Sequence, residues 1–502
     1  MVNFRTAGPG VTAHVRNATW SGFSAAVRAA TGLLMALLAV RLLGGVRYGQ
    51  LATLLSLFVL YLSLNSSIFT VLVTKLVGAP ETGHDHKKAD VLSAATIFAI
   101  ASIAVLVLLT VLIGEIAPLV FSPGEEGSGI GIEIRWAAMA MSVLTAIQIL
   151  VALHSAIIEG AGRLDLATKW QLAGPLAITF TLFLLFILHR PLSALGYVMV
   201  LCCGALIDLS LLMLLRYRLS LSPPSLRLSH GSIAQIWGLL RSGTTLQAAS
   251  LMNLFLEPLN KFLLNHFAGT LAVTGYDLAM KLIWGIQSLF AAAMRVFLHL
   301  SGEQGQVVGQ AFSRVLTLVL VPVLAVHTVA AIFLAWVTHH WVAIGDPRQF
   351  MVFFGIATVS NLGMIYITPL YISLIGRGDM RFILRSQTIV AITNLLVSVA
   401  LVPQFGLLGA AIGLLCATLF NVIAIYLRHE RTVGESGGLK PVLKGRSGHY
   451  AMSTLLFAAA ILTGAAQTVN IFAAASILLV VGIILIREPL VGTLAARLRP
   501  GK

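Results

Sequence analysis

The chain has 502 residues, of which 58% are hydrophobic and only 10% are charged, and its mean hydropathy is +0.94. This composition excludes a water-soluble globular protein. The formal net charge of +15 would suggest nucleic acid as a partner of a soluble protein. Here it is better explained by where the positive charges lie, so no nucleic acid partner is expected.

Apolar runs of about twenty residues recur along the whole chain, and each is long enough to cross a bilayer as a helix. We expect about fourteen such helices. Their centres lie near Met35, Val59, Val105, Leu144, Phe180, Val200, Leu254, Ile286, Val321, Ile356, Ala391, Leu414, Phe457 and Leu478. The connecting loops are too short for a catalytic domain. The sequence therefore predicts an all-α polytopic membrane protein.

The 33 Lys and Arg residues are distributed unevenly between the loops. With a cytoplasmic N-terminus, 24 of them fall in inner segments, 5 in outer segments and 4 within helices. The outer ones are Arg41, Arg47, Arg135, Arg190 and Arg348. Because positive charge accumulates on the cytoplasmic side, this distribution predicts that both termini are cytoplasmic and that the number of helices is even.

Arg28 interrupts the first apolar run and lies about 15 Å inside it by helical rise. A charge at this place indicates a retained membrane helix rather than a cleaved signal peptide. No acid lies close in sequence, although Asp208 in the sixth helix is a possible tertiary partner. Two interpretations remain open: a paired or snorkelling structural arginine, and a cation offered to a phosphate in a central cavity. Further along, Pro175 is expected to bend the fifth helix.

An internal repeat relates the two halves of the chain. The turn Gly160-Ala-Gly-Arg163 returns as Gly376-Arg-Gly-Asp379 at an offset of 216, and a pattern from Leu195 to Leu206 returns at an offset of 213. Six helices in each half predict two parallel lobes around a central cavity, followed by two extra helices. The expected domains are residues 1–216 (N-lobe), 217–241 (cytoplasmic linker), 242–428 (C-lobe) and 429–502 (helices thirteen and fourteen and a cytoplasmic tail).

The stretch from Ser250 to Arg295 is the most charged part of the membrane region. It consists of two apolar segments joined by a turn at 268–270. One carries Glu257 and Lys261, the other Asp277 and Lys281, and a spacing of four places each pair on one helical face. A charge at the bilayer centre costs ~2.5–3.5 kcal/mol on insertion scales, so such residues usually face partners or water.

The depths of these charges from the turn match across the hairpin. Lys261 and Asp277 both lie about 10 Å in, and Glu257 and Lys281 both lie about 15 Å in. Each lysine is therefore expected to meet the acid of the opposite segment. A structural clamp and a polar transport site are both compatible with this network. Pro258 is expected to kink the first segment beside it.

No motif for enzymatic chemistry occurs in the sequence. It contains no Walker motif, Gly-rich phosphate loop or Ser/His/Asp constellation. His154 and His327 lie in apolar helices and are expected to be packed and hydrogen-bonded. The three cysteines have no metal-ligand spacing. We therefore expect no metal, no cofactor and no enzymatic activity.

Several short motifs resemble the polysaccharide-lipid flippases of the Wzx type, within the multidrug/oligosaccharidyl-lipid/polysaccharide exporter superfamily. They are Arg41-Leu-Leu-Gly44 followed by Tyr48-Gly49, Leu256-Glu-Pro-Leu-Asn-Lys261 followed by Gly275-Tyr276, the Gly-Arg turns at 162 and 376, and the run 406–411. The resemblance implies alternating access. It also implies transfer of undecaprenyl-pyrophosphate-linked oligosaccharides from the cytoplasmic to the outer leaflet of the bacterial inner membrane, for polysaccharide biosynthesis. Asn260-Lys261 stands where an acidic-basic pair is usual, which leaves the acid's role to Glu257.

These observations lead to one reading with two alternatives. The expected substrate-binding residues are Arg28, Lys261, Lys281, Arg295, Asn253, Asn260 and Trp284, and the expected charge or ion-coupling network is Glu257, Asp277 and Asp208. The expected partners are the lipid-linked substrate, membrane lipids, a proton or sodium as the coupling ion, and the polysaccharide polymerase machinery. A drug or cation antiporter is the alternative within the superfamily, and a membrane polysaccharide polymerase or ligase is the alternative from another class.

Overall fold

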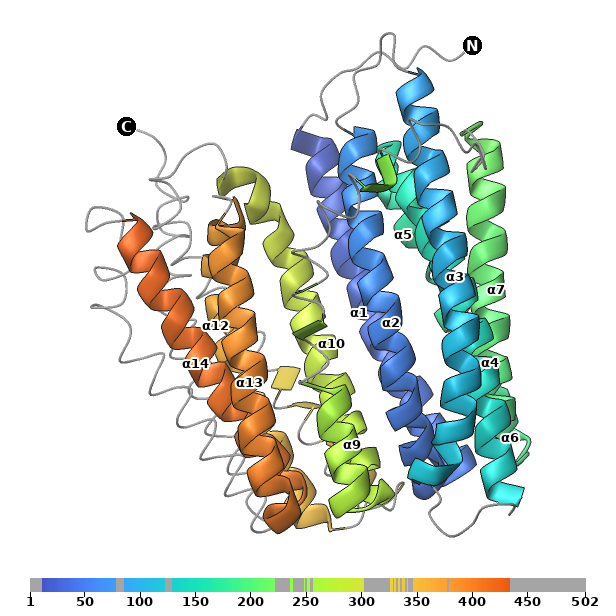
Figure 1. Ribbon diagram of the computed structural model, residues 1–502, viewed down its shortest axis with the longest axis vertical. Helices are drawn as coiled ribbons and strands as arrows, with labels where there is room; N and C mark the ends of the chain where they lie inside the picture. The colour runs from blue at the N-terminus through green and yellow to red at the C-terminus, as the bar shows by residue number, and fades with distance from the viewer. Residues whose placement is uncertain are drawn as a thin grey trace, which may run out of the picture. The chain divides into compact units, whose positions relative to one another are not determined.

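The computed structural model describes residues 11–77, 85–121, 129–221, 256–301, 346–376 and 379–433, together with short pieces at 235–237, 248, 251–252 and between 326 and 341. The regular structure of these residues is helical, without a strand (Figure 1). Eight spans in this part of the chain are long and apolar enough to cross a membrane. The prediction of an all-α polytopic membrane protein is confirmed.

The chain divides into two compact units, Met1–Asn265 and His266–Lys502. The predicted domain limits differ from this division, because they place the boundary at the basic linker 217–241. Most of that linker, and residues 434–502 with the last two expected helices, lie outside the described residues. The predicted domain limits therefore stay predictions.

Unit 1 contains seven described helices before residue 220. They are α1 (Val11–Leu43), α2 (Gly45–Val77), α3 (Asp85–Phe121), α4 (Gly129–Gly160), α5 (Leu164–Trp170), α6 (Ala173–Ile187) and α7 (Ala194–Arg218). Helix α4 packs against α2, α3 and α7, while α1 packs against α5 and α6. Buried aliphatic side chains such as Ile68, Leu72 and Leu153 form the core between α2, α3 and α4.

The fifth predicted membrane helix is interrupted rather than merely bent. It is built as α5 and α6, with Gln171 and Leu172 between them. Pro175 explains the position, because a proline ring clashes with the carbonyl group four residues earlier, which here belongs to Gln171. The predicted irregularity is confirmed. The break itself, at Gln171 and Leu172, lies one turn before Pro175.

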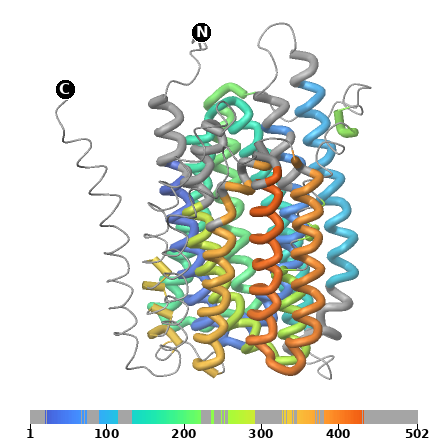
Figure 2. Tube along the Cα trace, turned by 90° about the vertical axis from the view of Figure 1, so that its left-hand side faces the viewer, coloured from blue at the N-terminus to red at the C-terminus, as the bar shows by residue number. Residues whose placement is uncertain are grey.

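Unit 2 contains α10 (Thr270–Ser301), α12 (Pro347–Gly376), α13 (Met380–Phe405) and α14 (Leu407–Val433) among its described residues. Helices α13 and α14 form a hairpin and lie side by side in both views (Figures 1 and 2). Gly406 turns the chain between them with φ +53°. At Gly413 a Cβ atom would lie 2.3 Å from the Ser398 hydroxyl, so glycine permits this close approach.

Both units repeat one packing arrangement. In unit 1, α4 packs against α2 and α7, and α7 packs against α6. In unit 2, α12 packs against α10 and α14, and α14 packs against α13. The corresponding helices are therefore α2 with α10, α4 with α12, α6 with α13 and α7 with α14. This correspondence agrees with the internal repeat predicted from the sequence.

Candidate transport site

Arg28 lies on α1 beside the interruption of the fifth span. Its Nη2 atom donates a hydrogen bond of 2.9 Å to Oε1 of Gln171, the first residue of the break. The Arg28 side chain is exposed rather than enclosed in the core of unit 1. Gln171 thus holds the guanidinium group of an arginine that is, as a residue, exposed.

Asp208, on α7, supports the same break. Its Oδ1 atom accepts a hydrogen bond of 2.7 Å from the backbone N–H of Gly174, in the first turn of α6. The carboxylate therefore binds one of the N–H groups that a helix start leaves unpaired. Arg28 lies within electrostatic range of the same carboxylate. Asp208, predicted as a tertiary partner of Arg28, is thus near it and also fixes the start of α6.

Gly174 is necessary for this arrangement. A Cβ atom at this position would lie 2.4 Å from Oδ2 of Asp208 and 2.6 Å from the carbonyl oxygen of Gly204. Helices α1 and α5 are also joined by a cation–π contact. Lys169 Nζ on α5 lies 4.0 Å from the centroid of the Trp20 ring on α1. The sequence reasoning missed Gln171, Gly174 and Lys169. Pro175 was the available signal, because proline frees backbone groups one turn earlier.

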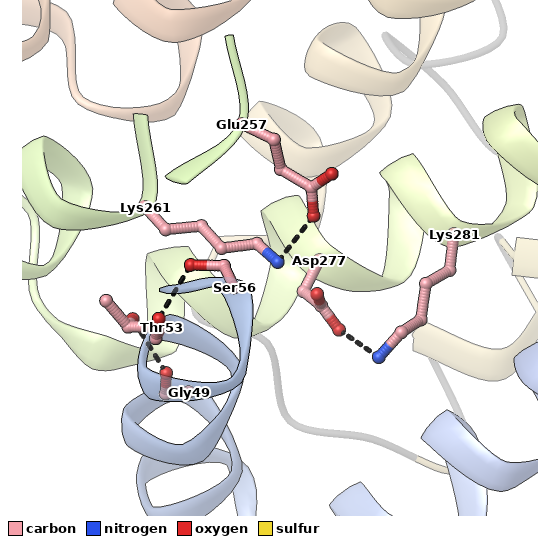
Figure 3. Close-up of polar contacts among 7 residues, drawn as sticks. All are labelled: Gly49, Thr53, Ser56, Glu257, Lys261, Asp277 and Lys281. Carbon is pink, nitrogen blue, oxygen red and sulfur yellow. Dashed lines mark hydrogen bonds and ion pairs between the residues drawn. The ribbon is translucent and has the colours of Figure 1, made fainter. Parts of the chain in front are cut away.

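In the first charged segment a helix begins at Pro258. Residues 256 and 257 form a turn, and helix α9 runs from Pro258 to Phe267. Proline is favoured at a first helical position, and the start of α9 at Pro258 lies where the kink was predicted. Lys261 Nζ donates to Oε1 of Glu257 at 2.6 Å (Figure 3). The Lys261 side chain is only 4% exposed, whereas that of Glu257 is 31% exposed.

The second charged segment lies on α10, after the predicted turn. Gly269 makes this turn with φ +85°, which favours glycine. Lys281 Nζ donates to Oδ2 of Asp277 at 2.7 Å (Figure 3). In this pair the acid is buried, with 2% exposure, and the lysine is 33% exposed. Both predicted i,i+4 faces therefore carry an ion pair within one segment.

The remaining predicted site residues are placed as follows. Asn260 is fully buried, and Trp284 on α10 is 42% exposed. Asn253 lies outside the described residues, as does the side chain of Arg295 within α10. The predicted pairs across the hairpin, Lys261 with Asp277 and Glu257 with Lys281, join residues of different compact units and stay predictions.

Both membrane histidines are packed and hydrogen-bonded, as expected. His154 on α4 is 4% exposed and His327 in unit 2 is fully buried. The His154 ring contacts the Leu150 carbonyl oxygen through Nδ1 at 2.9 Å and Arg216 Nη1 through Nε2 at 3.1 Å. In the described part of the chain, no group of three or more His, Cys, Asp or Glu side chains is arranged to hold a metal ion.

No family model matches the sequence, and no characterised protein matches it in sequence. Solved structures do match the fold. A lipid II flippase, MurJ, in an inward closed conformation has 13% identity and a TM-score of 0.64, over 94% of this chain and 99% of that chain. This likeness, together with the apolar helices, shows the fold of a multi-pass membrane protein.

Two multidrug transporters of the MATE type are similar to the same extent. DinF-BH, solved in complex with a ligand, has 15% identity and a TM-score of 0.61, over 85% of this chain and 97% of that one. An inward-facing MATE transporter of the MOP superfamily has 12% identity and a TM-score of 0.60, over 81% and 94%. At these identities the likeness concerns the fold. One of these three proteins is a flippase, and the other two are multidrug transporters.

Proposed function

We propose that this protein is a flippase for lipid-linked oligosaccharides and that Arg28 binds the pyrophosphate of the substrate. The observation that carries the proposal is the accessible guanidinium group beside a broken membrane span, oriented by Gln171. A guanidinium fork binds two phosphate oxygens at once, and a dianionic head group offsets the cost of a cation within the membrane. The transport class is supported by the flippase and transporter folds.

The other predicted site residues differ in exposure, and we assign their roles accordingly. Lys281 and Trp284 are partly exposed on α10, so the ammonium group can attract phosphate and the indole ring can contact a sugar. Lys261 and Asn260 are buried, so we assign them to holding Glu257 and the start of α9. Asn253 and Arg295 keep their predicted roles in substrate binding.

The orientation follows from the charge distribution, and the setting from the resemblance. The excess of Lys and Arg in the segments expected inside supports cytoplasmic termini. The resemblance to the Wzx-type flippases implies a bacterial inner membrane and transfer toward the outer leaflet. An undecaprenyl-pyrophosphate oligosaccharide would reach the site from the cytoplasmic leaflet and continue to polysaccharide polymerase machinery outside. Its long apolar tail would remain in the lipid.

A drug or cation antiporter is the second candidate. The MATE folds favour it, because their TM-scores differ little from that of the flippase. The partly exposed carboxylate of Glu257 also suits a cationic substrate. The two functions make opposite demands on charge: a flippase requires the accessible cation Arg28, and a cation exporter requires the accessible acid Glu257.

The decisive experiment uses purified protein in proteoliposomes. We expect Arg28→Ala to lower the transfer of a fluorescent undecaprenyl-pyrophosphate disaccharide to near the level of empty vesicles. Arg28→Lys should retain partial transfer, because it keeps the charge and loses the fork. Arg41→Ala is the matched control, since Arg41 is an exposed arginine near the end of the same helix.

The antiporter is tested in the same vesicles with a cationic dye. Dye transport that requires Glu257 and tolerates Arg28→Ala would overturn the flippase proposal. Lipid transfer that survives Arg28→Ala at wild-type rate would show that Arg28 does not bind the head group.

A further inference from the structure

A buried histidine and a buried asparagine connect three parts of unit 2. His327 is 0% exposed, and Asn361 on α12 is 4% exposed. The amide Nδ2 of Asn361 lies 3.2 Å from Nε2 of His327 and 3.3 Å from the backbone carbonyl oxygen of Ile283 on α10. One amide group therefore bridges the segment containing His327 to α10 and α12.

The direction of these two hydrogen bonds fixes the protonation of the histidine. A backbone carbonyl oxygen can only accept, so the group of Asn361 that faces Ile283 must be the NH₂ donor. The same nitrogen faces Nε2 of His327, so Nε2 must accept as well. Since a neutral imidazole has one donor and one acceptor, the ring proton lies on Nδ1 and His327 is uncharged here.

The contacts of Asn361 with His327 and Ile283 form what we call the junction, and a proton added to Nε2 is incompatible with it. Two donors would then face each other, and Asn361 would have to turn its amide by half a rotation to present Oδ1 to the imidazolium. That oxygen would then also face the Ile283 carbonyl oxygen, and the side-chain hydrogen bond from α12 to α10 would be lost.

We propose that His327 binds the coupling proton of this transporter and that its protonation releases α10 from α12. Helix α10 carries Lys281 and Trp284, which the proposed function assigns to substrate binding. The inference rests on that function for its meaning in transport, but the junction can be tested without substrate. It selects the proton from the two coupling ions that the sequence left open.

The other titratable groups on the packed elements do not replace His327. On α10 they are Asp277 and Lys281, which pair with each other, and Tyr276, with Arg295 and His299 among the side chains not described. On α12 they include Arg348 at the exposed start, and Tyr371. Helix α14, which also packs against α12, carries Arg428 and the buried His429. Of the described side chains on these elements, the two histidines are the ones whose charge ordinarily changes between about pH 5 and pH 8, so the pH response must be lost in His327→Gln and kept in His429→Gln.

The test measures the separation of the two helices as a function of pH. Spin labels are attached at Ser288→Cys on α10 and Gln349→Cys on α12, both exposed positions, in a chain whose three native cysteines are replaced by serine. We expect the distance distribution to change between about pH 8 and pH 5, with a one-proton midpoint. His327→Gln should abolish the change and retain the distribution seen at high pH.

A second variant shifts the junction in the opposite direction. Asn361→Asp has nearly the same volume, but its carboxylate cannot donate to the Ile283 carbonyl group and accepts from a protonated imidazole. We expect it to show the low-pH distribution already at about pH 8. This result also decides the matter where His327→Gln fails to fold.

His154→Gln is the matched control, because His154 is equally buried and hydrogen-bonded but belongs to unit 1. It should leave the pH response intact. A wild-type distribution that does not change with pH, or a change that persists in His327→Gln, would overturn the proposal. Failure of the flippase assay with an intact pH response would instead reject the substrate and keep the proton site.

Discussion

The two ion pairs of the central hairpin expose opposite charges. Lys261 is the buried member of the first pair and Asp277 the buried member of the second, with side-chain exposures of 4% and 2%. Their partners Glu257 and Lys281 are about one third exposed, at 31% and 33%. Each exposed member therefore compensates a charge that water does not reach, and its own loss should be the more harmful one.

This difference predicts an order of stability among four conservative variants. Glu257→Gln and Lys281→Met each remove the ion-pair partner of a buried charge, which typically costs ~3–5 kcal/mol of unfolding free energy. Lys261→Met and Asp277→Asn leave behind a partly hydrated charge and should cost less, about 1 kcal/mol. Thermal unfolding in detergent measures the order. Equal losses within each pair would show that exposure does not govern these interactions.

The residue scale was only partly predictable from the sequence. A spacing of four predicts that Glu257 and Lys261 share one helical face, as do Asp277 and Lys281, but the pairing expected from depth was across the hairpin. Which member is buried depends on the helices packed around it, and a single segment does not specify those. Arg28 was recognisable as a charge in an apolar run, whereas its hydrogen-bond partner Gln171 lies 143 residues away, and nothing in the local sequence relates the two.

At the scale of the element, the interrupted fifth span depends on one glycine. Gly174→Ala would place a methyl group 2.4 Å from Asp208 and 2.6 Å from the Gly204 backbone. We expect a loss of ~1–3 kcal/mol in unfolding free energy, since overpacking forces nearby groups to shift. A chemical denaturation curve measures the loss.

Gly32→Ala on α1 is the control for this variant. No atom would lie within 4 Å of its new Cβ, so it should be neutral or slightly stabilising in a helix. An unchanged stability of Gly174→Ala would mean that α6 and α7 separate readily. In that case the contact of Asp208 with the start of α6 would not hold the break together.

The sequence indicated where the span is irregular but not what completes it. Pro175 marks the position, because its ring and missing N–H act on the turn before it. The carboxylate that binds Gly174 comes from α7, 34 residues later. A contact of this kind follows from the packing of α6 on α7, which no local pattern contains.

At the scale of the whole molecule, the orientation in the membrane is the main prediction. In a chain without the three native cysteines, Arg190→Cys and Arg218→Cys place single thiols at exposed positions on either side of α7. An impermeant thiol reagent added outside intact cells should label position 190 and not position 218. The reverse pattern would invert the topology and the proposed direction of transport.

The general architecture was the most predictable part of the molecule. Twenty-residue apolar runs specify membrane helices almost by length alone, so the fold class follows from composition and spacing. The internal repeat indicated the shared packing of α4 with α7 and of α12 with α14. The limits of the two compact units were harder to predict, because the division falls within α9, where no change of composition marks it.

The two repeats differ at the break in the fifth span. At the repeat offsets, Pro175 corresponds to Ala391 and Asp208 to Asn421. Helix α13 accordingly runs without interruption, and the neutral amide of Asn421 accepts a hydrogen bond of 2.7 Å from the Ser386 hydroxyl. One half of the chain thus has a charged break, and the other has a continuous helix at the corresponding place. Under the proposed function this asymmetry predicts a stoichiometry: among the described residues the break with its arginine occurs in one half, so each chain binds one lipid head group although the helix packing is repeated.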